Sequence, residues 1–170
     1  MKKRIFVTFT AGLLLLLLYC LIFGFSEQDG ETSGNLSHAI TQLGVKFFNE
    51  ITGGRMTQHM IESAADYFEH PLRKAAHFGE YAVMGILTYS FLYYNIKSKH
   101  RRYIMAVIWV FVSAAMDEIH QFFVPGRFAS AADVLLDTCG GAFGAFLCTW
   151  IVRVYKRRHE KNSMKKQQER

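Results

Sequence analysis

The stretch DEIHQFFVPGRFASAADVLLD, residues 117–137, joins two strongly apolar segments of the chain. It contains four carboxylates, a glutamine, a histidine and an arginine, and the apolar runs 103–116 and 134–152 flank it. The pair Pro125-Gly126 suits a turn between two helices. Ionisable groups within segments of membrane-spanning length cost about 3 kcal/mol each on insertion scales, so such a cluster indicates a functional site.

The two apolar segments beside this stretch are among four in the chain that are long enough for a membrane-spanning helix, which needs about 20 residues. The chain has 170 residues, and the 51% that are hydrophobic occur in blocks, unlike those of a soluble core. Gly140 and Gly144 match the small-xxx-small pattern of close helix contact. The predicted fold class is all-α, a four-helix transmembrane bundle with spans over residues 5–25, 75–94, 103–123 and 131–152.

The long segment between the first two spans, residues 26–70, is predicted to carry amphipathic interfacial helices. Its beginning, residues 26–37, is small, polar and acidic, and we expect a flexible linker there. Apolar residues then recur at helical spacing in two pieces, residues 37–52 and 57–70. The second piece would stop before Pro71, where we expect the second span to begin.

The basic residues predict the orientation of the bundle. Most Lys and Arg residues lie at the two termini and between the second and third spans. Because such residues collect on the cytoplasmic side, both termini are expected in the cytoplasm and the turn at 124–130 outside. The formal net charge of +6 follows from this topology, so we expect no nucleic-acid partner. The chain is therefore divided into a first transmembrane helix (1–25), an extracellular loop (26–70), a core of three transmembrane helices (71–152) and a basic cytoplasmic tail (153–170).

Three of the predicted helices carry charged residues at the same outer level. In the second span they recur at i, i+4 and i+7, and in the fourth at i and i+4, so each set shares one helix face. Lipid cannot satisfy these groups, so they must face one another, a ligand or a wet cleft. The candidate binding residues are Arg73, His77, Glu80, Asp117, Glu118, Gln121, Arg127, Asp133 and Asp137.

Three motifs in residues 70–150 together resemble those of VanZ-like membrane proteins. The resemblance implies a multi-pass protein of the bacterial cell membrane. The namesake of the family is associated with low-level resistance to the glycopeptide teicoplanin, which acts on cell-wall precursors outside the membrane, so the resemblance also implies a link to glycopeptide resistance. The motifs are Arg73-Lys74-x-x-His77-Phe78-x-Glu80-Tyr81, Asp117-Glu118-x-His120-Gln121-x-Phe123-x-Pro125-Gly126-Arg127 and Asp133-Val134-x-x-Asp137.

The first functional hypothesis is a non-enzymatic protein whose outward-facing charged cleft binds or handles a headgroup. Arg73 and Arg127 would pair with phosphate or carboxylate, and the acids would accept amines or hydroxyls. The expected partner is a membrane lipid or a cell-wall precursor. No cofactor is expected, and the oligomeric state stays open.

The alternative is a membrane-embedded enzyme acting on a lipid headgroup by acid–base chemistry. A nucleophile is missing, since no Ser or Cys pairs visibly with His77, and this weighs against an enzyme. A metal-assisted version lacks the two-histidine spacing of zinc signatures. A third reading is that the charges form internal ion pairs that set the helix register. The catalytic candidates are His77, Glu80, Asp117 and Glu118, and the metal candidates are His77, Glu80, Asp117 and Asp133.

Overall fold

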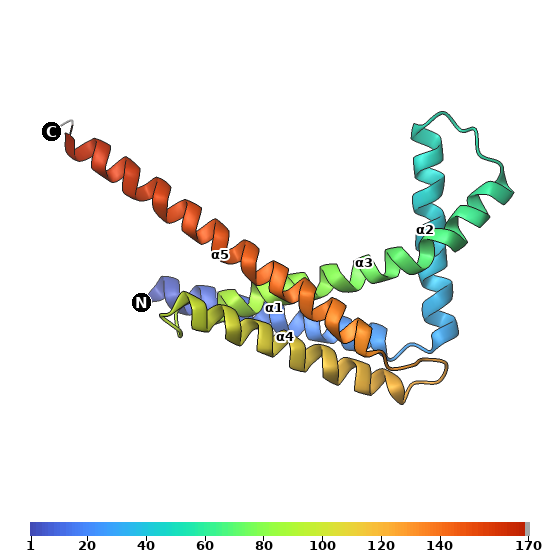
Figure 1. The fold of residues 1–170 in the computed structure, drawn as a ribbon, viewed down its shortest axis with the longest axis horizontal. Coiled ribbons are helices and arrows are strands. Elements are labelled where there is room, and N and C mark those ends of the chain that lie inside the picture. Colours follow the sequence, from blue (N-terminus) through green and yellow to red (C-terminus); the bar gives the residue numbers. More distant parts are fainter. Residues whose placement is uncertain (169–170) are drawn as a thin grey trace.

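The protein is built of helices alone over the residues that its structure describes. The structure is a computed structural model that describes residues 1–168, with the side chains of 1–158 and of Met164. It contains five helices and no strand in that range (Figure 1), which confirms the all-α prediction. The helices are α1 (Lys2–Ser26), α2 (Gly30–Ile51), α3 (Gln58–Leu92), α4 (Lys99–Phe122) and α5 (Ala131–Gln168).

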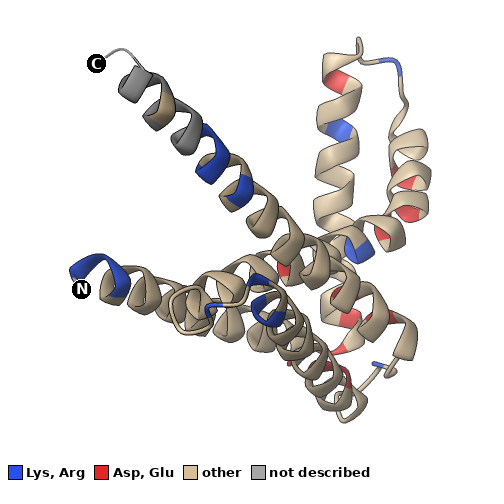
Figure 2. Ribbon diagram, turned by 60° about the vertical axis from the view of Figure 1, so that its left-hand side comes forward, with Lys and Arg blue, Asp and Glu red and all other residues tan. Residues whose placement is uncertain are grey.

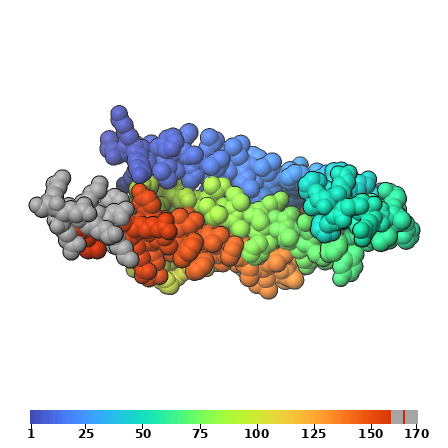
Figure 3. All heavy atoms as spheres, turned by 90° about the horizontal axis from the view of Figure 1, so that it is seen from above, coloured from blue at the N-terminus to red at the C-terminus, as the bar shows by residue number. Residues whose placement is uncertain are grey.

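Helices α1, α3, α4 and α5 form an elongated bundle, and α2 crosses one end of it. α3 packs along both α1 and α5, and α4 packs along α5. α2 packs on the first half of α3, and these two segments form one end of the molecule (Figure 3). The start of α1 lies at the other end of the bundle, away from the turn between α4 and α5 (Figure 1).

Three helices are long and apolar enough to cross a membrane: α1, α4 and the part of α5 from Ala131 to Arg158. Large apolar side chains such as Phe9, Leu16 and Trp109 are exposed on them, as lipid contact requires. α3, whose second half we expected to form the second span (residues 75–94), is not among these helices. Its apolar half carries His77, Glu80 and several tyrosines, which lower its mean hydropathy.

The predicted linker over residues 26–37 is wrong for most of its length, because α2 begins at Gly30. Asp29 caps this helix, its side chain accepting a hydrogen bond from the Thr32 amide at 2.7 Å. That hydrogen bond lowers the pKa of the Asp29 carboxyl. The predicted end of the helix is confirmed, since Gly53 and Gly54 follow it with φ of 105° and 66°.

The predicted break before Pro71 is also wrong. α3 runs through Pro71 without interruption. Proline removes one helical hydrogen bond, but α2 packs on the helix before it, and α1 and α5 pack on the helix after it. α3 bends where it passes from α2 into the bundle (Figure 1).

Two of the domain boundaries drawn from the sequence therefore fall inside helices. The boundary at residues 70–71 lies within α3, and the boundary at 152–153 lies within α5, which continues to Gln168. Residues 169–170 of the predicted basic tail lie outside the described residues.

Glycines bring α3 and α5 into backbone contact. Gly140 and Gly144 of α5 lie against the main-chain oxygens of Phe78 and Ala82 on α3, and Gly85 of α3 lies against that of Gly141. A Cβ atom at Gly85, Gly140 or Gly144 would collide with a backbone oxygen. The predicted close helix contact is confirmed, and its partner is α3.

Replacing Gly144 with Ala tests this contact. The added methyl group meets the Ala82 carbonyl, so we expect Gly144→Ala to lower the free energy of unfolding by about 2 kcal/mol. Thermal unfolding in detergent, followed by tryptophan fluorescence, measures the loss. The control is Gly79→Ala on α3, where no atom lies within 4 Å and stability should not fall. Equal stability of both variants would contradict the contact.

Candidate functional site

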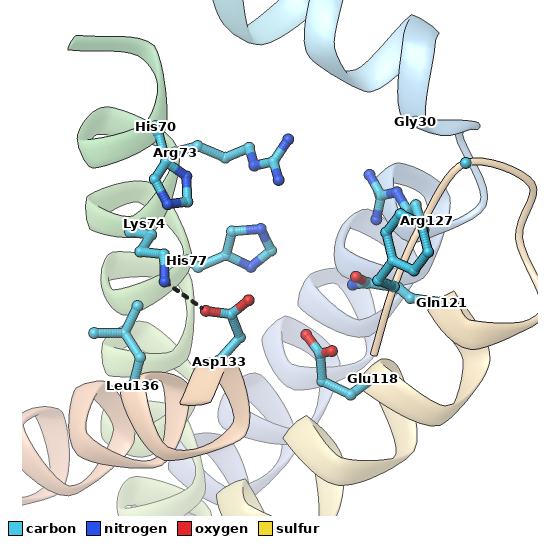
Figure 4. Close-up of a pocket in the computed structure, with 12 residues that line it drawn as sticks. Gly30, His70, Arg73, Lys74, His77, Glu118, Gln121, Arg127, Asp133 and Leu136 are labelled. Atoms are coloured by element: carbon cyan, nitrogen blue, oxygen red, sulfur yellow. Dashed lines mark ion pairs between the residues drawn. The ribbon is translucent and has the colours of Figure 1, made fainter. Parts of the chain in front are cut away.

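A charged cavity of about 220 Å³ lies at the end of the bundle where the α1–α2 and α4–α5 connections meet. Residues from α2, α3, α4, α5 and the α4–α5 turn contribute to its wall, and Figure 4 shows their side chains. The lining residues are Gly30, His70, Arg73, Lys74, His77, Glu118, Gln121, Gly126, Arg127, Phe128, Asp133 and Leu136.

A second cavity, of about 190 Å³, adjoins the first. It lies between the end of α1, the first half of α2 and the middle of α3. Glu80 and Asp117 contribute its acidic groups, and most of the remaining wall is apolar. Four residues line both cavities: Arg73, His77, Gln121 and Arg127.

Arg127 fixes the corner between α1 and α2 over the cavities. Its Nη2 donates hydrogen bonds to Ser33 Oγ at 2.7 Å and to the Phe25 carbonyl at 3.3 Å. In the same turn the Gly30 amide donates to the Pro125 carbonyl at 3.1 Å. Burial lowers the pKa of the Arg127 guanidinium, and Arg73 adds to this by repulsion, although arginine stays charged in proteins.

The two acids in the first cavity already have partners. Lys74 Nζ lies 3.0 Å from Asp133 Oδ1 in an ion pair. Glu118 Oε2 accepts a hydrogen bond from the Ser130 amide at 2.7 Å, which ties the end of α4 to the start of α5. Neither carboxylate is therefore committed to an arginine.

Arg73, unlike Lys74 and Arg127, has no partner among the described residues. It forms no hydrogen bond or ion pair within the described part of the chain. Its side chain and that of Arg127 approach the cavity from opposite sides, with His77 beside them (Figure 4). The upper part of the cavity is therefore lined by two cations that face each other.

Two acids are buried deeper in the bundle. Asp117 is 2% exposed and accepts hydrogen bonds through Oδ2 only, from Tyr81 Oη at 3.3 Å and Gln121 Nε2 at 3.0 Å. Its Oδ1 is buried without a partner. Asp137 is 1% exposed and also has a buried oxygen without a partner. Such groups are costly in a bundle, which favours a role other than stability.

The structure brings eight of the nine predicted binding residues to the two cavities. Asp137 is the exception, since it lines neither cavity. It nevertheless lies close enough to interact electrostatically with Asp117, Glu118, Asp133 and Glu80. Residues at both cavities are Arg73, His77, Gln121 and Arg127; Glu118 and Asp133 line the first, and Glu80 and Asp117 the second.

Some residues of the site were not found from the sequence. Tyr81, which was not among the candidate residues, is 1% exposed and donates a hydrogen bond to the buried carboxylate of Asp117. Its position next to Glu80 in the first motif is the sequence feature that could have indicated a role in the site. Ser33 and the other α2 residues were missed because their segment was expected to be a linker.

The catalytic and metal candidates do not form a reactive group in the described residues. No set of three or more His, Cys, Asp and Glu residues there is placed to hold a metal ion, and this includes the candidates His77, Glu80, Asp117 and Asp133. No hydroxyl or thiol is hydrogen-bonded to His77 among them. Ser130, the hydroxyl of the turn, instead accepts a hydrogen bond from the Asp133 amide at the start of α5.

Asp137→Asn separates a structural role from a functional one. Removing one member of a buried ion pair costs about 3–5 kcal/mol, but Asp137 has no such partner. We therefore expect Asp137→Asn to unfold at or above the wild-type temperature in detergent. The control is Glu27→Gln, an exposed acid on the α1–α2 connection. A fall of about 3 kcal/mol, as for a broken ion pair, would show that Asp137 serves the fold.

Comparison with known proteins relates the chain to a family. No curated protein and no solved structure matched it. The family model described as VanZ/LLP1 matches residues 11–153, which contain all nine predicted binding residues. With its helices long and apolar enough for a membrane and this match over most of its length, the chain belongs to the VanZ/LLP1 family.

Proposed function

We propose that this protein binds the anionic headgroup of a membrane lipid or cell-envelope precursor between Arg73 and Arg127. The observation that supports the proposal is the pair of guanidinium groups that face each other across the charged cavity, Arg73 having no acidic partner. Guanidinium groups bind phosphate and carboxylate through two parallel hydrogen bonds. An anion between them would remove the repulsion between two like charges.

The acids of the site favour a headgroup that also carries hydrogen-bond donors. Asp117 lines the second cavity together with the shared residues, and its Oδ1 has no hydrogen-bond partner in the described residues. Glu118 lines the first cavity. Hydroxyl or ammonium groups of the ligand would satisfy these oxygens. A phosphate attached to a glycerol, a sugar or an amine combines both features.

The proposal includes an orientation in the membrane. α3 would also span the membrane, beside α1, α4 and α5. Lys and Arg residues concentrate at the start of α1, around the α3–α4 connection and on the C-terminal part of α5. Acidic residues concentrate at the opposite end of the molecule (Figure 2). By the positive-inside rule the termini would be cytoplasmic and the cavities would open outward. α2 would then lie along the outer interface, since it crosses the end of the bundle.

Glycopeptide resistance would follow if the bound headgroup were that of a cell-wall precursor. Teicoplanin acts on such precursors outside the membrane, and the proposed cavity opens on that side. A protein that holds or shields a precursor would then change how much of it the drug reaches.

The second candidate function is an enzyme that uses His77, Glu80, Asp117 and Glu118 for acid–base chemistry on a headgroup. In its favour, His77 and Asp117 line the same cavity, and one oxygen of the Asp117 carboxyl has no partner in the described residues. Against it, no hydroxyl or thiol within the described residues is hydrogen-bonded to His77 as a nucleophile would be. Water would have to attack, and headgroup release from a bound lipid would be the reaction to look for.

Arg73→Gln tests headgroup binding. Hydrogen bonds to a charged group contribute about 1.5–3 kcal/mol, so the variant should bind phosphatidylglycerol at least about tenfold more weakly. Native mass spectrometry of the detergent-extracted protein measures both the lipid that copurifies and the affinity for added phosphatidylglycerol. Arg73 is preferable to Arg127, because Arg127 also holds the α1–α2 corner.

Arg55→Gln is the matched control, since Arg55 is an exposed arginine on the α2–α3 connection, away from both cavities. It should bind lipid as the wild type does. Both variants should melt at the wild-type temperature. If Arg73→Gln retains lipid as well as Arg55→Gln does, the proposal is wrong.

A further inference from the structure

The charged cavity and its neighbour adjoin each other in the fold. Four side chains line both, so Arg73, His77, Gln121 and Arg127 form the boundary between them. Beyond that boundary the exposed surface of the wall changes from mostly polar to mostly apolar. A ligand that fits both spaces must therefore be charged at one end and apolar at the other.

The apolar side chains that line the second cavity do not pack tightly against one another. Phe25, Leu36, Ile40 and Leu72 remain between 41% and 54% exposed, although they surround one cavity. They come from three different helices. Together with a buried isoleucine and an alanine, the apolar lining comprises Ile22, Phe25, Leu36, Ile40, Leu72 and Ala76.

The corner that covers this cavity is held by specific bonds. The Arg127 side chain connects the α4–α5 turn with the end of α1 and the first turn of α2. Gly30 and Gly126 lie in close contact there, and a Cβ on Gly30 would meet the Gly126 carbonyl. The apolar space is therefore built into the fold next to the arginines, with its walls fixed at the charged end.

We propose that the second cavity holds the hydrocarbon chain of the bound lipid, close to its glycerol, while the phosphate lies between Arg73 and Arg127. This inference rests on the proposed function and narrows the ligand to an intact glycerophospholipid whose headgroup carries hydroxyl groups. The hydroxyl groups would donate to the carboxylates of the site, including Asp117 Oδ1, which has no partner. A polyprenyl phosphate has a chain and a phosphate but no such donors, and a free glycerophosphate has no chain.

Ala76→Trp tests where the chain lies. Ala76 is an exposed position on α3 that lines the second cavity, so an indole there would fill the space without disturbing the core. We expect at least a tenfold loss of dioleoyl-phosphatidylglycerol binding in native mass spectrometry. Binding of the soluble headgroup glycerophosphoglycerol should change less than twofold, because the arginines are untouched.

The matched control is Ala75→Trp. Ala75 is the adjacent exposed residue of α3, but it lines a separate apolar groove against α2 and contributes nothing to either cavity of the site. Phosphatidylglycerol binding to this variant should stay within twofold of wild type. Comparable melting temperatures of the two tryptophan variants establish that both fold.

A photoactivatable phosphatidylglycerol, with a diazirine near the glycerol end of its chain, gives a second measurement that needs no cavity-filling variant. The label should map to the end of α1, the first half of α2 and residues 72–76 of α3, and Arg73→Gln should remove it.

The outcomes distinguish the inference from the proposed function. If Ala76→Trp binds phosphatidylglycerol as wild type does, or the label spreads over the outer surface of α1, the chain lies elsewhere and the inference fails while headgroup binding stands. Tighter binding of undecaprenyl phosphate than of phosphatidylglycerol also overturns the inference. If Arg73→Gln leaves binding of every probe unchanged, headgroup binding itself fails.

Discussion

The close approach of α3 to α5 is the constraint on which the rest of the structure depends. Glycines on both helices place backbone against backbone, so the faces above this contact are held at a short, fixed separation. Those faces carry Arg73 and His77 on α3 and Asp133 on α5. Bulkier residues at the glycine positions would separate the helices and open the site. In lipid, where apolar side chains gain little by leaving the surrounding chains, small residues are the usual means of bringing helices together.

Some of the charged groups above that contact have partners within the protein and others do not. Asp133 forms an ion pair with Lys74, and Glu118 accepts a hydrogen bond from the backbone of the turn, so each of these acids has a partner within the protein. Arg73 has no partner in the described residues, and Asp117 uses only one of its two oxygens. If the cluster served only to set the helix register, each charge would be expected to find a partner, because an unpaired charge in a membrane is expensive. The remaining unpaired groups are of opposite sign, which suits a ligand with both an anionic group and donors.

The lining of the second cavity shows what α2 contributes to the site. α2 packs on α3 at the end of the bundle, and it also supplies Leu36 and Ile40 to the apolar wall and Ser33 to Arg127. One helix thus contributes to both the apolar and the charged part of the site.

Much of the site could be predicted from the sequence. Helical periodicity placed Arg73, His77 and Glu80 on one face, and hydropathy located the apolar segments, because both depend only on local geometry and composition. Local rules failed at Pro71 and over residues 26–37. The helix around Pro71 is held by neighbours on both sides, and a single capping residue, Asp29, starts α2 in a segment whose composition suggested a linker.

By itself, then, the sequence determined that the chain is helical, that its apolar segments are of membrane-spanning length, that its charged residues collect near one end, and which family it resembles. Only the tertiary structure decided which of those charges neutralise one another, which stay unpaired, and that an apolar cavity adjoins them. Pairing and cavities depend on distances between atoms of different helices. Those distances are set by how closely α3 approaches α5 and by where α2 crosses the bundle, and no pattern along one segment contains them.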